Sequence, residues 1–141
     1  MSFVYTLLMS EIAGLLEARG LDPDLGFFHE IDYGRPSLAL DLLEPLRHPV
    51  ADRLVLTLAN RGEFKAEDFE TAGESGGLFL RPAALKRFFG EYEKWMLARS
   101  AGGSFRERLR RHVSVFAAAL EDERDWSPVR FLDDREETVA A

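Results

Sequence analysis

The sequence of 141 residues contains no cysteine, which excludes disulfide bonds and metal sites built from thiolates. No apolar run approaches the roughly 18 residues that a membrane-spanning helix needs. The opening residues, MSFVYTLLMSE, contain neither a basic segment nor a small-residue cleavage site, so they do not resemble a secretory signal peptide. We therefore expect a cytoplasmic protein that does not enter the membrane.

The charge is unbalanced toward acid, because 25 Asp and Glu against 18 Lys and Arg give a formal net charge of −7. This balance argues against a strongly basic protein that binds nucleic acid without specificity. The bases are nevertheless clustered. The best candidates for contacts to DNA phosphates are four arginines of one predicted helix, Arg106, Arg108, Arg110 and Arg111. The alternative is that they form an ordinary solvated helix face.

The spacing of apolar residues predicts an all-α fold, a single helical bundle of about five helices in a domain of residues 1–132. The expected helices are residues 2–19, a helix from residue 38 that kinks near Pro45, residues 49–60, residues 82–99, and a last helix capped by Ser104 that reaches about residue 122. Residues 133–141 are acidic and predict a flexible tail.

The segments between these helices carry turn and cap signals. Gly20 is expected to end the first helix and Ser37 to cap the second. Residues 63–77 are polar and predict a connector, and residues 100–103 predict a flexible link. Residues 78–80 predict a very short strand or an apolar contact.

The predicted core consists of the apolar residues that recur on one face of each helix. They are Phe3, Leu7, Leu38, Leu42, Leu54, Leu58, Phe88, Trp95, Leu109 and Phe116.

One group of residues could hold a metal ion. Steps of three and four residues stay on one helix face, so Asp41 and Glu44 can point at one spot, on an arc that also holds Ser37 and His48. His29 could reach that spot from the preceding loop. An imidazole with two carboxylates suits Mg²⁺ or Mn²⁺ better than Zn²⁺. The competing interpretation is a solvated pair of acids and a structural histidine, since no dense ligand motif is present.

The order of short motifs adds a second kind of evidence. Gly-Leu-Asp-Pro, Gly-Phe-x-His, Ser-Leu-Ala-Leu-Asp-Leu and Asn-Arg-Gly follow one another, and Trp126-Ser-Pro stands near the end. Over roughly residues 2–132 the chain resembles the helical C-terminal domain of the CRISPR-associated integrase and endonuclease of spacer acquisition, the universal "Cas-one" family.

This resemblance implies a metal-dependent DNA nuclease and integrase that inserts spacers into a repeat array. His29 matches the family's histidine ligand, Glu44 its later acidic ligand, and Asp41 the auxiliary acid of the same segment. The implied ion is Mg²⁺ or Mn²⁺. The implied partners are DNA, both spacer precursor and repeat, and a second CRISPR adaptation subunit.

One ligand of the family has no counterpart here. The family's first glutamate lies on an earlier helix, behind an N-terminal β-rich domain, and none of Glu11, Glu17, Asp22 and Asp24 matches its position. We therefore expect a fragment, a split gene product or an isolated domain, which is poorly active or inactive without the remaining part of the family protein.

Two other functions stay open from the sequence. The chain could be a non-catalytic helical module that binds DNA or a protein partner, or a structural domain that docks onto the missing part. Metal-dependent cleavage would separate an enzyme from both.

Overall fold

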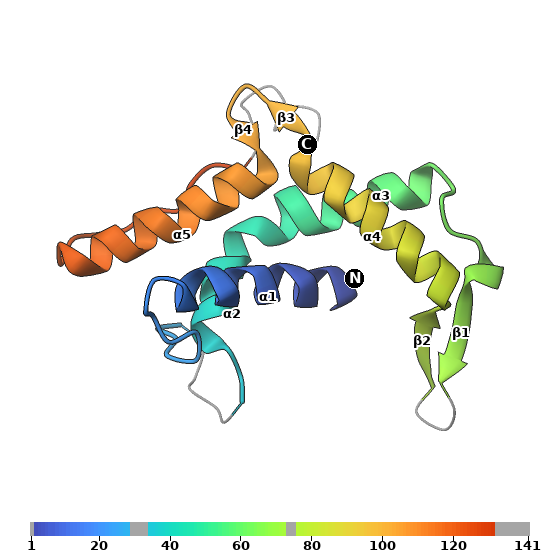
Figure 1. Ribbon diagram of the computed structural model, residues 1–141, viewed down its shortest axis with the longest axis horizontal. Coiled ribbons are helices and arrows are strands. Elements are labelled where there is room, and N and C mark those ends of the chain that lie inside the picture. The colour runs from blue at the N-terminus through green and yellow to red at the C-terminus, as the bar shows by residue number, and fades with distance from the viewer. Residues whose placement is uncertain (1, 29–33, 73–75, 132–141) are drawn as a thin grey trace.

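The computed structural model describes residues 2–28, 34–72 and 76–131. This part of the chain is mostly helical, which confirms the predicted fold class. Its α-helices are α1 (Ser2–Glu17), α2 (Ser37–Leu43), α3 (Arg53–Asn60), α4 (Pro82–Leu97) and α5 (Phe105–Glu121). Helix α1 lies at the centre, while α5 and a small β-hairpin lie at opposite ends (Figure 1). Within the described ranges, no helix has the length and apolar character to cross a membrane.

The core forms because each helix buries apolar side chains at nearly every fourth position. Steps of four residues stay close to one face of a helix, so each series points toward the neighbouring helices. The series are Val4, Leu8, Ile12 and Leu16 in α1; Leu38, Leu42, Leu46, Val50, Leu54 and Leu58 from α2 to α3; Ala84, Phe88, Tyr92 and Met96 in α4; and Leu109, Val113 and Phe116 in α5.

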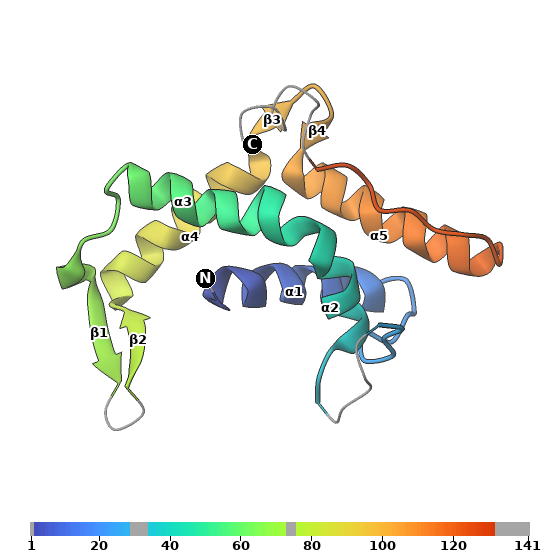
Figure 2. The same cartoon turned by 180° about the vertical axis from the view of Figure 1, so that it is seen from behind.

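The predicted break at Pro45 is confirmed, and it takes the form of a change of helix type. After α2 the chain makes a 3-10 turn, η1 (Glu44–Leu46), and then a π-helical segment, η2 (Arg47–Asp52), before α3. Proline lacks an N–H group, so Pro45 and Pro49 each remove one regular helical hydrogen bond. The prediction that Pro49 starts a separate helix is wrong, because Pro49 lies inside η2. Figure 2 shows the resulting bent path from α2 to α3.

The first helix ends as predicted, but the cap of the second is different. Gly20 adopts φ +73°, and Leu21 N–H donates to Leu16 O at 3.1 Å, which closes α1 in a glycine-dependent C-cap. Ser37 is not the N-cap, because it is the first residue of α2 and Pro36 occupies the cap position without a side-chain cap hydrogen bond. The carbonyl of Pro23 accepts from the N–H groups of Leu38 and Ala39 at 2.8 and 3.2 Å instead.

Two segments that we expected to be irregular form small β-hairpins. Residues 69–72, part of the predicted connector, are strand β1 (Phe69–Ala72), which pairs antiparallel with β2 (Gly77–Leu80). The predicted link around residues 100–103 joins β3 (Arg99–Ser100) to β4 (Gly103–Ser104). Pairing between the neighbouring strands satisfies their backbone N–H and C=O groups. These short polar segments contain no apolar periodicity from which the strands could have been predicted.

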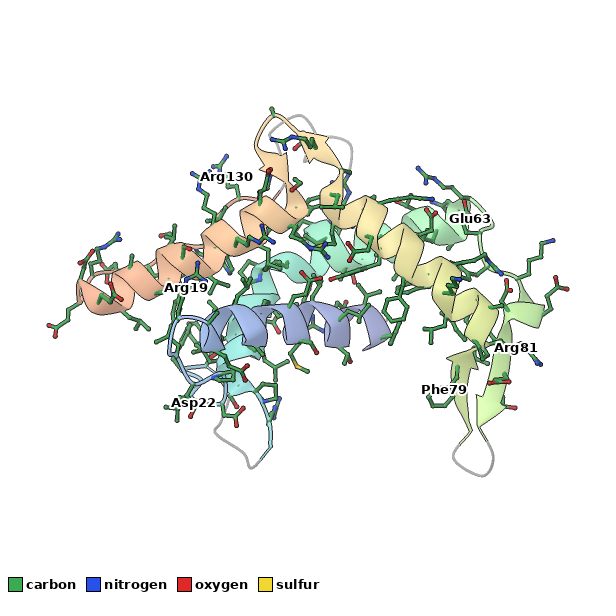
Figure 3. The ribbon with its side chains drawn as sticks, in the orientation of Figure 1. Arg19, Asp22, Glu63, Phe79, Arg81 and Arg130 are labelled. Atoms are coloured by element: carbon green, nitrogen blue, oxygen red, sulfur yellow. The ribbon has the colours of Figure 1, made fainter. Side chains whose placement is uncertain are left out.

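The prediction of a buried core position is wrong for Phe3. Phe3 is 38% exposed, although its ring lies 5.3 Å from that of Phe88. It lines an apolar groove of about 480 Å³ together with Leu78 and Phe79 of the hairpin, so nothing in the described chain encloses it. Figure 3 shows Phe79 on the side of the hairpin toward α1. Leu7 and Trp95 are partly buried, and the other predicted core residues are buried.

Candidate metal centre

Asp41 lies under the loop that precedes α2. Its side chain is buried, with 3% of the residue exposed. Its Oδ2 atom accepts hydrogen bonds from the backbone N–H groups of Phe27 at 2.7 Å and Phe28 at 3.0 Å. Hydrogen bonds to an ionised carboxylate are stronger than those between neutral groups. Asp41 therefore fastens residues 26–28, the site loop, to α2, and it is not part of a solvated helix face.

Gly26 allows the site loop to come this close. A Cβ atom at this position would lie 2.6 Å from Ser37 Cβ and 3.0 Å from Asp41 Oδ2. Contacts below 3.0 Å require a shift of the backbone, so only glycine fits without moving the loop. The sequence contained this signal in the Gly-Phe-x-His motif, but its steric reason depends on α2.

Glu44 has the opposite environment. It is the first residue of η1, its side chain is 50% exposed, and its carboxylate pairs with Arg47 at 3.0 Å. The Arg47 guanidinium lies over the Tyr5 ring of α1, 4.9 Å from the centroid. Tyr5 in turn donates a hydrogen bond to the Asp52 carboxylate, which raises the pKa of the Tyr5 hydroxyl. Glu44 thus faces solvent one helical turn from the buried Asp41.

His29 lies outside the described residues, so its relation to the two acids stays a prediction. Among the residues that the structure describes, no three His, Asp or Glu side chains are close enough to hold a metal ion. Of the residues predicted to share one helix face, Ser37 is buried and His48 is exposed on η2. These residues therefore do not form one common surface. What the described part provides is an exposed carboxylate, Glu44, and a loop held at the residue directly before His29.

His112 has a structural role that the sequence did not reveal. It is completely buried in α5, and its Nδ1 accepts the N–H of Val129 at 3.3 Å. The other ring nitrogen, Nε2, must therefore carry the proton, and it donates to Leu42 O of α2 at 3.0 Å. Burial lowers the pKa of His112 to about 4, so the imidazole is neutral at pH 7.

Two of the four clustered arginines are occupied inside the molecule. Arg106 pairs with Glu11 of α1 at 2.9 Å and with Glu93 of α4 at 2.6 Å. Arg108 is buried and donates to the carbonyl of Phe131 at 2.6 Å. These contacts join α1, α4 and α5 and tie the end of the described chain to α5.

Arg110 and Arg111 have exposed side chains. They are the members of the cluster that could reach DNA phosphates without first leaving an internal contact.

Glu11, one of the acids considered for the unmatched ligand, belongs to the same internal network. Besides Arg106, its carboxylate accepts a hydrogen bond from the Tyr92 hydroxyl at 2.8 Å. Burial raises the pKa of the Tyr92 hydroxyl above its usual value, and the negative charge of Glu11 raises it as well. The structure therefore uses Glu11 to connect three helices.

Comparison with known proteins agrees with this fold and these motifs. Residues 1–94 match the family model of the CRISPR associated protein Cas1. The chain belongs to the Cas1 family. The family resemblance inferred from the motif order is thereby confirmed.

Relatives within the Cas1 family are substantially similar in sequence. The CRISPR-associated endonuclease Cas1 1 of Chlorobaculum tepidum is 47% identical over 94 residues, which cover 67% of this chain and 27% of that protein. The protein of the same name from Thermodesulfovibrio yellowstonii is 38% identical over 125 residues, covering 89% of this chain and 37% of that protein.

Solved structures share the fold. A casposase bound to an integration product superposes with a TM-score of 0.77 and 28% identity, covering 92% of this chain and 38% of the casposase. A Cas1 protein from Thermotoga maritima gives a TM-score of 0.76 and 27% identity, covering 89% of this chain and 40% of that chain. In all four comparisons this chain therefore spans well under half of the matched protein.

Proposed function

We propose that this chain is the C-terminal helical domain of a metal-dependent DNA endonuclease and integrase that inserts spacers into a CRISPR repeat array. It would supply part of the active site, with His29 and Glu44 as metal ligands. Asp41 would be a further ligand, or it would hold the histidine loop in place. The proposal draws on the Cas1 family membership and on the arrangement of the site loop over α2.

The observation that carries the proposal is the capture of the Phe27 and Phe28 backbone by Asp41. Consecutive Cα atoms are about 3.8 Å apart, so fixing Phe28 restricts where the next side chain, that of His29, can go. Because Asp41 and Glu44 lie one turn apart, the helical path from α2 into η1 would fix the loop and present the exposed carboxylate.

The donor set fits Mg²⁺ or Mn²⁺, since carboxylate oxygens with one imidazole nitrogen suit these ions. When bound, such an ion would polarise a phosphoryl oxygen and stabilise charge on the attacking or leaving oxygen of a phosphodiester. Within this chain, Arg47 holds the Glu44 carboxylate in one orientation through their 3.0 Å ion pair. Gly26 and Asp41 keep the site loop close to α2.

The partners of the proposed domain are DNA, the remaining part of a Cas1 protein, and a second adaptation subunit. For DNA, the exposed Arg110 and Arg111 are the members of the arginine cluster best placed to contact phosphates. Arg106 and Arg108 would first have to break internal contacts with Glu93, Glu11 or Phe131.

The proposal is tested by titrating the chain with Mn²⁺ and recording which NMR signals broaden. Broadening should centre on residues around His29, Asp41 and Glu44, and it should weaken in Glu44→Gln and His29→Ala. Glu70→Gln, an exposed acid on β1, is the matched control and should leave the pattern unchanged. Broadening spread evenly over all exposed acids, or equal in Glu44→Gln and wild type, would refute the metal site.

A binding role without catalysis is the second candidate, and the exposed pair Arg110 and Arg111 favours it. Such a module would bind DNA with an affinity that falls steeply with salt, and binding would not depend on His29. Measuring DNA binding from low to high salt for wild type, His29→Ala and Arg110→Ala/Arg111→Ala separates the two functions.

A further inference from the structure

After α5 the chain reverses direction and runs back along the helix (Figure 1). The reversal is made at Glu123, which adopts φ +50°. A residue with a side chain adopts this conformation at a cost on the order of 1 kcal/mol, so contacts further along must hold the returning segment. Glu123 N–H donates to Leu120 O at 3.3 Å, and Arg124 N–H donates to Ala119 O at 3.0 Å. We call residues 125–131 the C-terminal strap.

The first contact of the strap is with the site loop. The Trp126 ring lies edge-on to the Phe27 ring at 6.3 Å and edge-on to the Phe116 ring of α5 at 5.3 Å. The Phe27 and Phe116 rings stack at 5.9 Å, with 20° between their planes. The Phe27 ring therefore contacts two aromatic rings, while its backbone N–H donates to Asp41. Edge-to-face and stacked arrangements of this kind are favourable.

The second contact of the strap reaches α2 through His112. The strap donates from Val129 N–H to Nδ1 of the imidazole, and Nε2–H donates to Leu42 O. Leu42 lies between Asp41 and Glu44 in the sequence, on the part of α2 that leads into η1. The strap is fastened at its far end by Phe131, which is buried and whose carbonyl accepts from Arg108 at 2.6 Å.

We infer that the C-terminal strap positions the described part of the candidate metal site, which is the site loop and the helical path that carries Asp41 and Glu44. Trp126 would hold the site loop, and His112 would connect the strap to α2. Trp126 would be a positioning residue, because its ring packs against Phe27, Phe116 and His112, whereas the two acids lie on the path from α2 into η1. The inference rests on the proposed function only for its effect on metal binding. Its structural part, the holding of the site loop, can be measured without a metal.

The test uses the full chain and compares Trp126→Ala, Trp126→Phe and Trp95→Ala. The protein has two tryptophans, and Trp95 of α4 stacks on Phe105 away from the site loop, so Trp95→Ala is the matched control. Hydrogen exchange of the Phe27 and Phe28 amides reports whether the loop is held. The affinity for Mn²⁺, measured by NMR line broadening, reports whether the site is positioned.

In Trp126→Ala we expect exchange of the two amides to rise about tenfold or more and Mn²⁺ affinity to fall by a similar factor. Trp126→Phe should restore most of both, because it keeps an aromatic ring against Phe27. Trp95→Ala should lower the stability measured by urea denaturation. It should leave unchanged the ratio of the exchange rates of the Phe27 and Phe28 amides to those of the core amides. If Trp126→Ala does not fold, Trp126→Leu takes its place in the same comparison.

Two outcomes would overturn the inference. One is a loop exchange in the Trp126 variant no faster than in Trp95→Ala, and the other is faster exchange with unchanged Mn²⁺ affinity. If wild type binds no Mn²⁺ while loop exchange still rises in Trp126→Ala, the strap holds the loop, and it is the proposed function that fails.

Discussion

Asp41 and Glu44 are three residues apart on one helical path, and their surroundings differ sharply. Asp41 is buried beneath the site loop, whereas Glu44 is half exposed and paired with Arg47. The difference follows from the loop, because Gly26 lets the backbone of Phe27 and Phe28 approach Asp41 and leaves Glu44 uncovered. The path from α2 into η1 thus provides one acid for structure and one that could meet a ligand.

Replacing Asp41 should weaken the fold. Asp41→Ala removes the acceptor of two backbone N–H groups and leaves both without it in a partly buried place. Hydrogen bonds to charged groups contribute about 1.5–3 kcal/mol each, so we expect the free energy of unfolding to fall by about 2–4 kcal/mol in urea denaturation. Asp41→Asn keeps one acceptor oxygen and should cost less. Equal stability of wild type and Asp41→Ala would contradict this reading.

His112 should make stability depend on pH. Its pKa is about 4 in the folded protein and about 6.5 in an unfolded chain. Between these values the unfolded state binds more protons, so stability is fully present above pH 6.5 and falls as the pH is lowered toward 4. The expected loss from this group is about 3 kcal/mol over that window.

The measurement is urea denaturation of wild type and His112→Gln at several pH values from 7 to 4. Asp and Glu side chains titrate in both proteins, so the difference between the two free energies of unfolding reports the imidazole alone. The stability of wild type relative to the variant should decrease as the pH falls, and parallel curves would show that burial of His112 is not what shifts its titration.

At the scale of elements, local signals account for where most helices begin and end. Helix α5 starts with a reciprocal cap, in which Ser104 Oγ accepts from Glu107 N–H at 3.2 Å and Glu107 Oε2 accepts from Ser104 N–H at 2.8 Å. This pair was visible in the sequence as a serine followed three residues later by a glutamate. The start of α2 was not, because the Pro23 carbonyl replaces a side-chain cap there.

Removing the cap of α5 should have a moderate effect. Ser104→Ala loses the acceptor for the Glu107 N–H, and such substitutions cost about 1 kcal/mol. Ser10→Ala is the control, because Ser10 is exposed within α1 and bonds only to the carbonyl of Thr6 in its own helix. Urea denaturation should show a lower midpoint for Ser104→Ala and little change for Ser10→Ala. Similar losses in both would point to a general effect of removing a hydroxyl.

The whole molecule combines a candidate metal site with an acidic net charge. Its net charge is −7, and two of its four clustered arginines are occupied by internal contacts. Affinity for DNA grows with the number of phosphates that a protein neutralises, so we expect weak DNA binding. The chain also spans 27% to 40% of the four matched proteins described above, which leaves much of their length without a counterpart here.

We therefore predict that this chain alone cleaves or joins DNA poorly. The assay uses branched and linear DNA with Mn²⁺ and compares wild type with His29→Ala. Little activity in both is the expected result, with activity rising when the remaining part of a Cas1 protein is added in trans. Strong cleavage by wild type that disappears in His29→Ala would show instead that the residues present suffice.

The sequence by itself determined where most of the helical segments lie, because hydrogen bonding within a helix and the periodic placement of apolar residues depend only on neighbours along the chain. The end of α1 at Gly20, the change of helix type at Pro45 and the cap at Ser104 all follow from that local chemistry. The motif order also indicated the family and the residues to examine, although the joint position of His29, Asp41 and Glu44 stays a prediction.

Only the tertiary structure decided which of these residues are covered. Spacing placed Asp41 and Glu44 on one face but could not tell that the site loop buries the first and leaves the second exposed. It could not show that Arg106 binds acids of α1 and α4, or that His112 joins the C-terminal strap to α2. It also misplaced Phe3, which lies in an open groove. Burial and pairing depend on segments far apart in the sequence, and local periodicity contains no information about which of them will meet.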